Sequence, residues 1–346
     1  NLVSEQPESE PAYEGSVRAG SRGLFEGSLD ATGPLTEDGR VLYRLNALYR
    51  NEDYFRDFDT DINRFFVAPV ISWAISDSQG DSSASRTDLN LQLEYLDEER
   101  PLDTGLVAFG DGLADIPQDR VLGELDDEIS SDYFSAGYTL EHRFSDNWKL
   151  RNAFRYIRDA DDISAALSFP FIGGLDEATG TLNRVFGEQE VVNTTYALQT
   201  NTVGEFSTGP IDHRLLLGLD LARYELKSES FTDFSLRIPI NIFDPVYGAV
   251  ARPERSDEIL SGDTIDTDSL RIYVQDQMQI TDELSLVAGI SYETTEQTST
   301  DLIDETESEQ NEDAFTPLIG LVYQPLDNLS IYANYSQSFL PNSAIT

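Results

Sequence analysis

The chain has 346 residues, a formal net charge of −41 and no cysteine. The lack of cysteine excludes disulfides, thiolate metal sites and cysteine nucleophiles. The excess of acid argues against nucleic-acid binding, which needs clustered Lys and Arg. Apolar runs such as 65–75 and 215–222 are interrupted by Pro69 or by Asp220. None therefore approaches the ~18 residues of a transmembrane helix.

Apolar residues alternate with polar ones along most of the chain. This period of two is typical of β-strands with one buried face. By this pattern we predict about thirteen strands between Tyr13 and Ser338. In chain order, the clearest segments are 41–49, 89–95, 148–156, 215–221, 284–292 and 329–335.

After a first tight hairpin at 20–23, short and long connections alternate. The short ones are rich in Gly, Pro, Asp and Asn, the usual turn formers. Outer-membrane barrels place short turns in the periplasm and long loops outside. The alternation therefore predicts an all-β, transmembrane, antiparallel up-and-down barrel. The short connections are 33–39, 76–83, 145–147, 208–212, 281–283 and 325–328, and the long ones are 51–62, 96–130, 159–190, 225–267 and 295–313.

The five predicted loops hold most of the acidic residues, and 301–313 contains acids and no base. One interpretation is that these are solvated loops. Another is that they bind divalent cations, which could bridge the loops to anionic lipid. The residues alone leave both open.

We find no motif for catalysis or a metal centre. His142 and His213 are the only histidines and fall in different predicted strands, so a shared metal site is not expected. Acidic pairs such as Asp161 and Asp162 lie in loops, where charge runs are usually solvated. Phosphate-loop, nucleophile-elbow and zinc-protease motifs are missing. We therefore predict that the protein is not an enzyme and holds no covalently bound cofactor.

Two predicted loops carry apolar patches, at 167–174 and 238–247. Exposed apolar clusters commonly mark contacts. We take Phe169, Phe171, Phe243 and Tyr247 as candidate ligand-binding residues, with packing of loop on loop as the alternative. A further set of aromatics at strand ends is expected to anchor at lipid headgroups. These are Tyr49, Tyr54, Phe55, Trp73, Tyr95, Phe144, Trp148, Tyr224, Tyr323 and Tyr335.

Several segments resemble TonB-dependent siderophore receptors, in particular the ferrichrome and ferric-hydroxamate branch. The most telling is 328–339, NLSIYANYSQSF. The order and spacing of all five segments follow that family along nearly the whole chain. The other four are 1–7 (NLVSEQP), 27–35 (GSLDATGPL), 41–47 (VLYRLNA) and 271–277 (RIYVQDQ).

The resemblance implies a barrel of about 22 strands with a plugged lumen, of which about thirteen strands are present here. Residues 1–12 would form the junction between plug and barrel, and 13–346 a partial barrel domain. The implied function is uptake of a ferric siderophore across the cell outer membrane. The implied partners are that ferric siderophore, outer-membrane lipid, and the TonB-ExbB-ExbD system acting through an N-terminal region missing here.

We expect a monomer that does not bind nucleic acid. Two alternatives remain open on the residues. One is a porin or an outer-membrane receptor for another cargo, such as a vitamin, haem or a sugar. The other is a soluble β-rich binding module.

Overall fold

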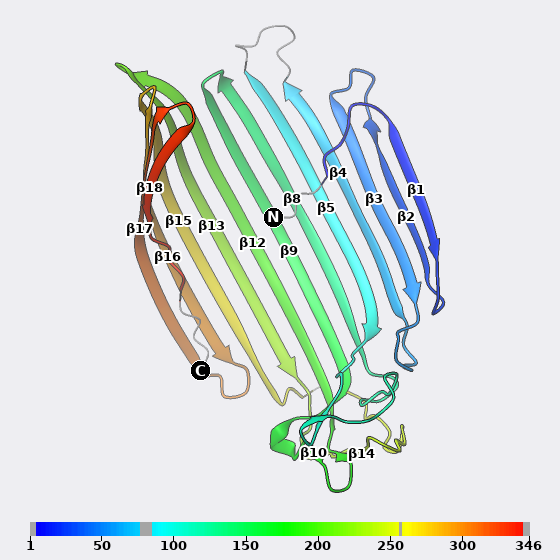
Figure 1. Ribbon diagram of the computed structural model, residues 1–346. Helices are drawn as coiled ribbons and strands as arrows, with labels where there is room; N and C mark the ends of the chain where they lie inside the picture. The colour runs from blue at the N-terminus through cyan, green and yellow to red at the C-terminus, as the bar shows by residue number, and fades with distance from the viewer. Residues whose placement is uncertain (1–4, 77–84, 256–257, 342–346) are drawn as a thin grey trace.

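The computed structural model describes residues 5–76, 85–255 and 258–341. Its main element is a curved antiparallel sheet of thirteen strands, which follow one another around the sheet in chain order (Figure 1). The strands are β1 (Ala12–Ala19), β2 (Phe25–Pro34), β3 (Val41–Glu52), β4 (Ile62–Ser76), β5 (Arg86–Pro101), β8 (Glu128–Ser145), β9 (Trp148–Leu167), β12 (Val185–Thr208), β13 (Ile211–Ser230), β15 (Ser261–Thr281), β16 (Leu284–Asp301), β17 (Glu307–Leu326) and β18 (Leu329–Ser336).

The predicted up-and-down order of thirteen strands is confirmed. Within the described residues, β1 and β18 are the two free edges and do not pair with each other. The sheet is therefore a wall of a barrel rather than a closed one. In the described residues we find no helix long and apolar enough to cross a membrane.

The strands run further than the apolar alternation indicated. The predicted long loop 295–313 is wrong, because β16 continues to Asp301 and β17 starts at Glu307. The other four long connections exist but are shorter than expected. At the outer ends of β16 and β17 both faces are polar, so the period-two pattern disappears while the hydrogen-bond ladder continues. The predicted turn 76–83 lies almost entirely outside the described residues.

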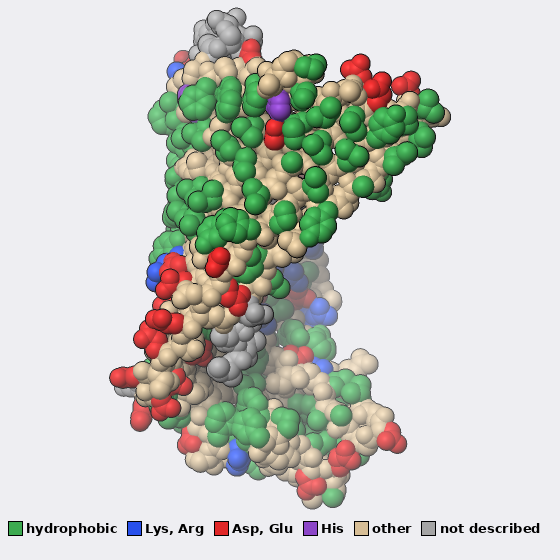
Figure 2. All heavy atoms as spheres, turned by 90° about the vertical axis from the view of Figure 1, so that its left-hand side faces the viewer, with side chains coloured by type: hydrophobic (Ala, Val, Ile, Leu, Met, Phe, Trp, Pro, Cys, Tyr) green, Lys and Arg blue, Asp and Glu red, His purple; other side chains and the backbone are tan. Residues whose placement is uncertain are grey.

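One face of the sheet is apolar and forms the outer surface of the wall. On β13 it carries Leu215, Leu217, Leu219 and Leu221, which alternate with residues of the opposite face. Figure 2 shows hydrophobic side chains crowded over the upper part of the wall and acidic ones gathered below them, toward the long loops. This arrangement is the apolar band of a membrane barrel, with a charged region beyond it.

A row of aromatic rings marks the border of that band. Between neighbouring strands, directly opposite or diagonal to each other, rings meet at centroid distances of 4.8–6.5 Å. Tyr49 and Tyr95 belong to the row, as predicted for interfacial residues. The ring pairs are Phe25–Tyr49, Phe65–Tyr95, Phe134–Tyr156, Tyr156–Tyr196 and Tyr292–Phe315.

Not every predicted interfacial aromatic lies on this outer face. Tyr54 and Phe55 lie in the loop after β3, with their rings tilted to each other and their centroids 4.7 Å apart. Tyr224 alternates with the outer leucines of β13, so it faces the lumen, where its hydroxyl donates to Asn193 at 2.6 Å. Trp148, by contrast, does lie on the outer face, at the start of β9 near the short-turn end.

The opposite, concave face is polar and lines the lumen. It bears charged side chains at the alternate positions, among them Arg44, Arg151, Arg155 and Arg271. Residues 5–10 cross this face ahead of β1 (Figure 1). There Arg44 pairs with Glu5 and, at 3.5 Å, with Glu8.

The long connections join into a compact cap at the outer end of β5, β8, β9 and β12 (Figure 1). It contains two small sheets and one turn of 3-10 helix. In Figure 2 the cap projects at the bottom of the molecule and reaches across the hollow beside the wall. The cap elements are β6 (Ala108–Phe109), β7 (Gly112–Leu113), η1 (Pro170–Ile172), β10 (Leu175–Asp176), β11 (Thr181–Leu182) and β14 (Ile240–Asn241).

Candidate functional site: the outer cap

The cap has a hydrophobic core of its own. Leu122, Leu182, Ile240 and Ile242 are buried together, although they come from three different connections. A second small cluster joins Ile238 to the strand ends beneath. Burying apolar side chains in this way stabilises the association of loops that have little regular structure of their own. The alternative of loop-on-loop packing is thus correct for Ile240 and Ile242 of the second apolar patch.

Three of the four candidate ligand residues belong to two aromatic groups on this cap. Phe169 and Phe171 stack at 5.2 Å and both contact Phe234. Phe243 meets Phe109 edge-on at 5.5 Å. Phe171 is 71% exposed and Phe243 46% exposed, so these rings can still meet a ligand.

Tyr247 differs from these phenylalanines, because its side chain makes contacts within the cap. Its ring packs against the cap core, and its hydroxyl donates to the carbonyl of Val121 at 2.8 Å. Burial raises the pKa of this phenol. Ligand contact by Phe169, Phe171, Phe243 and Tyr247 stays a prediction.

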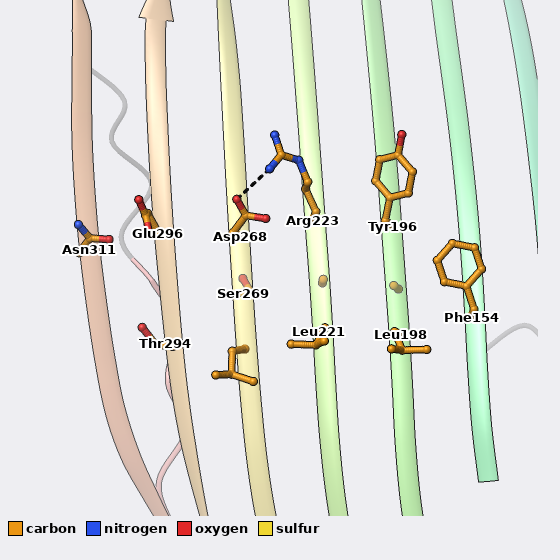
Figure 3. Close-up of a pocket in the computed structure, with 13 residues that line it drawn as sticks. Phe154, Tyr196, Leu198, Leu221, Arg223, Asp268, Ser269, Thr294, Glu296 and Asn311 are labelled. Atoms are coloured by element: carbon orange, nitrogen blue, oxygen red, sulfur yellow. Dashed lines mark hydrogen bonds and ion pairs between the residues drawn. The ribbon is translucent and has the colours of Figure 1, made fainter.

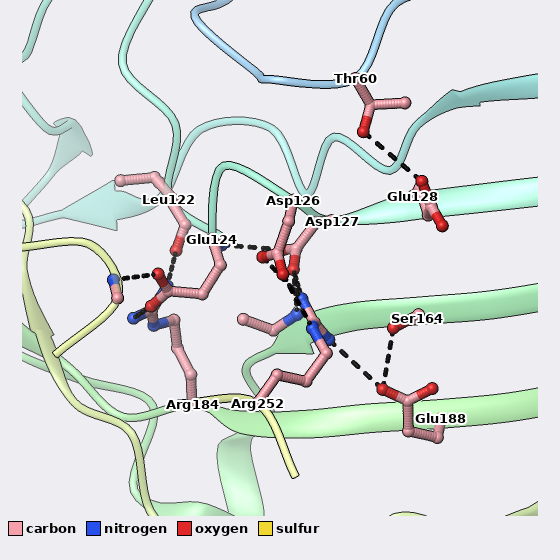
Figure 4. A network of polar contacts seen from close by, with 12 residues as sticks. Thr60, Leu122, Glu124, Asp126, Asp127, Glu128, Ser164, Arg184, Glu188 and Arg252 are labelled. Carbon is pink, nitrogen blue, oxygen red and sulfur yellow. Dashed lines mark hydrogen bonds and ion pairs between the residues drawn. The ribbon is translucent and has the colours of Figure 1, made fainter. Parts of the chain in front are cut away.

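A buried arginine ties the connections of the cap together. Arg184 is 1% exposed and donates to the Glu124 carboxylate at 2.6 Å. It also donates to the carbonyls of Ile238 and Leu122, each at 3.2 Å. The second oxygen of Glu124 accepts from the backbone N–H of Gly248 at 2.7 Å. Figure 4 shows this arginine and its glutamate facing each other between the loops.

A second arginine joins the cap to the strand ends. Arg252 donates to Asp127 at 2.7 Å and to Asp126 at 3.0 Å, and reaches Glu188 at 3.4 Å (Figure 4). Its guanidinium lies over the Phe186 ring at 4.7 Å. Such a cation on an aromatic face is favourable, most of all where water is excluded.

Asp127 is the fully buried acid of this network. Its carboxylate also accepts from the backbone N–H of Ala166 at 2.8 Å and of Glu124 at 2.9 Å. Burial nevertheless raises the pKa of Asp127 to about 6. Hydrogen bonding from Arg252 lowers the pKa of the more exposed Asp126. Two adjacent acids on one arginine therefore titrate in different ranges.

The long connection between β3 and β4 is attached to the rest of the cap through Arg56. Its Nε lies 2.8 Å from Asp103, and its Nη1 donates to the carbonyl of Arg120 at 2.7 Å. Charge-assisted bonds thus join the connection after β3 to the one after β5. All four long connections form one body.

A cleft of about 430 Å³ opens in the cap beside this network. Asp59, Asp126, Phe186, Tyr247 and Arg252 are among its lining residues. A ligand there would meet aromatic and acidic surface together.

A family model for the TonB dependent receptor-like beta-barrel matches residues 72–345. The chain belongs to the TonB-dependent receptor family. It is 30% identical to the metal-pseudopaline receptor CntO of Pseudomonas aeruginosa, covering 99% of this chain and 47% of CntO. It is 28% identical to the ferrioxamine B receptor of Salmonella typhimurium, covering 99% and 47%. The chain thus spans about half the length of the curated relatives that it matches.

Solved structures of other receptors share the fold. The Pseudomonas aeruginosa ferripyoverdine receptor, bound to ferripyoverdine, gives a TM-score of 0.80 at 19% identity, over 99% of this chain and 44% of that one. The ferric-catecholate import receptor Fiu of E. coli K12, in its open form, gives 0.78 at 20% identity, over 98% and 56%. The chain is an outer-membrane receptor barrel, and its family consists of transporters rather than enzymes.

Family membership explains why one cavity is not a ligand site. A groove of about 440 Å³ is lined by Tyr196, Leu198, Leu221, Arg223 and Asp268, among others (Figure 3). These side chains share the outer face of the wall, at the border of the apolar band. In a receptor barrel that face meets lipid, and cargo does not pass there.

The two histidines also lie on the outer face, in different strands. His142 contacts Thr87 at 2.9 Å, and His213 pairs with Asp276 at 2.7 Å. No cluster of three possible metal ligands occurs in the part of the chain that the structure describes.

Sequence reasoning missed the rings that complete the two aromatic groups, Phe109 and Phe234. A weak indication for Phe109 was its position in the apolar stretch 106–109. No local sequence pattern predicts the contacts of Arg184 and Arg252, because their partners are more than fifty residues away in the sequence.

Proposed function

We propose that this receptor barrel takes up a ferric siderophore across the outer membrane, with energy supplied through TonB. The observation that carries the proposal is the cap, in which the long connections are joined into one body at the outer mouth of the wall and expose the rings of Phe171 and Phe243. Flat rings and a cleft suit capture of a chelate that presents both apolar and polar surface. No covalent chemistry is needed.

Two kinds of relative support this cargo class. The receptors named for ferrioxamine B and for ferrichrome match 99% and 100% of the chain, at 28% and 24% identity. Membership of the TonB-dependent receptor family supports coupling to TonB.

A second candidate cargo is a metal complex that is not restricted to iron. The relative named as a metal-pseudopaline receptor has 30% identity, and it supports this candidate. The acidic cap is compatible with either cargo, provided that the complex is not strongly anionic.

The test is uptake by cells that make the full-length receptor, under iron starvation and with a panel of labelled metal chelates. The paired change Phe171→Ser and Phe243→Ser is expected to weaken binding of the true cargo about tenfold or more, because each exposed ring supplies contact area. Phe55→Ser, an exposed ring in another loop, is the matched control. Uptake of a ferric chelate supports the first candidate, and uptake of other metals with the same chelator supports the second. No chelate uptake, in cells where the receptor is folded, contradicts both.

A further inference from the structure

The cleft of about 430 Å³ in the cap is bounded by four segments that lie far apart in the sequence. Asp59 comes from the connection after β3, and residues 124–126 come from the connection after β5. Phe186 stands near the start of β12, and residues 247–252 follow β13. Ligand pockets usually measure roughly 300–1,000 Å³. A cleft near the lower end of this range suits one arm of a metal chelate better than the whole complex.

Part of the lining of this cleft is apolar. It includes the buried ring of Phe186, the half-buried ring of Tyr247 and the side chain of Val250, which is 37% exposed. Moving methylene groups from water onto such surface favours binding. This part of the cleft therefore suits an aliphatic chain.

The charged part of the lining has an excess of acid. It contains the carboxylates of Asp59, Glu124 and Asp126 and a single guanidinium, that of Arg252. Glu124 is already neutralised by Arg184 at 2.6 Å. The Asp59 carboxylate makes no ion pair or hydrogen bond with the part of the chain that the structure describes. The side chain of Asp126 is bound to Arg252 but remains 61% exposed.

The backbone holds Asp59 and Asp126 close to each other. The N–H of Asp59 donates to the carbonyl of Leu125, the residue before Asp126, at 2.8 Å. Both acids line the same cleft. Charges of one sign gathered in a cleft focus their field there and attract ions of the opposite sign. The cleft is therefore suited to a cation.

Arg252 does not offset this preference, because its three guanidinium nitrogens already face carboxylates (Figure 4). Nε and Nη2 donate to Asp126 at 3.2 and 3.0 Å, and Nη2 also donates to Asp127 at 2.7 Å. Nη1 reaches Glu188 at 3.4 Å. One face of the guanidinium lies over the Phe186 ring. An anionic ligand would find no unpaired donor on this arginine.

We propose that this cleft binds a cationic arm of the cargo, an alkyl chain that ends in an ammonium group. The ammonium donates to Asp59 and Asp126, and the methylene groups pack on Phe186 and Val250. This site, whose assignment rests on the function proposed above, narrows the cargo to metal chelates with such an arm. The same carboxylates repel a chelate whose arm is anionic, so the cap selects cargo by charge.

The test measures binding of ferric chelates to the full-length receptor in detergent, through quenching of its intrinsic fluorescence. The probes are three chelates with hydroxamate, catecholate or carboxylate ligands, each carrying a butylamine arm that is either free or acetylated. Acetylation removes the charge and keeps the chain, so the free amine should bind about tenfold more tightly in whichever chelate the receptor accepts. Asp59→Asn combined with Asp126→Asn should abolish this preference by weakening binding of the free amine.

Two further variants separate the cleft from the general charge of the cap. Asp59→Asn alone removes a carboxylate that holds no other described side chain, so it should reduce the preference without disturbing Arg252. Asp111→Asn changes an exposed acid in the turn between β6 and β7, outside the cleft, and should leave the preference intact. Heat-modifiable mobility on gels verifies that each barrel is folded.

Two results would overturn the cationic-arm site and leave the proposed function standing. The first is equal binding of the free and acetylated arms by the wild-type receptor. The second is a preference that survives the double change, or that falls equally in Asp111→Asn, which would make it an effect of the overall charge. Binding of none of the three chelates by the folded receptor would instead contradict the proposed function, and the site with it.

Discussion

The cap and the wall reach stability by different means. Nearly all the buried apolar side chains of the described chain lie in the cap or in the strand ends beneath it, with Ala31 and Val70 the exceptions. The wall is a single layer, with its apolar face turned outward and its polar face turned to the lumen. Its own contacts are the hydrogen-bond ladder and the pairs of neighbouring side chains. The cap is thus a small globular unit with its own core. The stability of the sheet, in contrast, depends on contacts of its two faces with lipid and with the contents of the lumen.

The sharpest test of this difference is Arg184→Ala. It leaves the Glu124 carboxylate buried without its cation, which should cost about 3–5 kcal/mol of local stability. Hydrogen exchange should show opening of 107–127 and 238–248, while β15 to β17 stay protected. Glu124→Leu combined with Arg184→Met, which removes both charges, should recover much of the loss. Equal exchange in wild type and Arg184→Ala would contradict a cap held by this pair.

A cavity in the cap core should have the next largest effect. Ile242 is fully buried, so Ile242→Ala should lower cap stability by about 2–5 kcal/mol. Ile272, which is 52% exposed on the outer wall, is the control. In detergent, Ile272→Ala should cost under about 1 kcal/mol. Similar costs at both sites, measured by exchange, would remove the distinction between cap and wall.

The cap should also respond to mild acid. Because its folded pKa of about 6 lies above its ordinary 3.8, Asp127 contributes stability that is complete below 3.8 and is lost as pH rises through about 6. Cap stability should therefore increase by about 2 kcal/mol between pH 7 and pH 4.5. Asp126, whose pKa is lowered, affects stability only below that window.

Asp127→Asn provides the control for this pH effect, since it cannot titrate. Local opening of 120–128, followed by exchange corrected for intrinsic rates, should lose most of its pH dependence in this variant. A cap that weakens steadily from pH 7 to pH 4.5 would contradict the assignment to Asp127.

The smallest effect is expected on the outer wall. Arg223 contacts Asp268 at 3.1 Å with its side chain 45% exposed. Exposed pairs of this kind contribute about 0–1 kcal/mol, so Arg223→Ala should leave the thermal midpoint within a few degrees. A large drop would mean that the outer pairs support the wall more than single-layer packing suggests.

Sequence reasoning predicted the wall well and the cap poorly, for a physical reason. Strands such as β13 have a period of two because lipid and lumen impose opposite chemistry on alternate residues. Beyond the membrane both faces meet water, so the pattern gave no sign that β16 reaches Asp301. The contacts of the cap join residues far apart in sequence, as Arg252 and Asp127 are, and no local spacing reveals them. The candidate ligand residues Phe169, Phe171, Phe243 and Tyr247 were identified only because they belong to apolar patches within predicted loops.

The length of the strands beyond the aromatic row has a consequence for where cargo is met. Tyr196 stands near the middle of the 24-residue strand β12, so about half of that strand lies outside the membrane. At ~3.3 Å per residue and a tilt of ~45°, this lifts the cap roughly 25 Å above the lipid surface. The Debye length at physiological ionic strength is only about 8 Å. A solute that approaches at that height is therefore shielded from charges on the bilayer. The first electrostatic field that it meets comes from the carboxylates of the cap and of the strand ends beneath it.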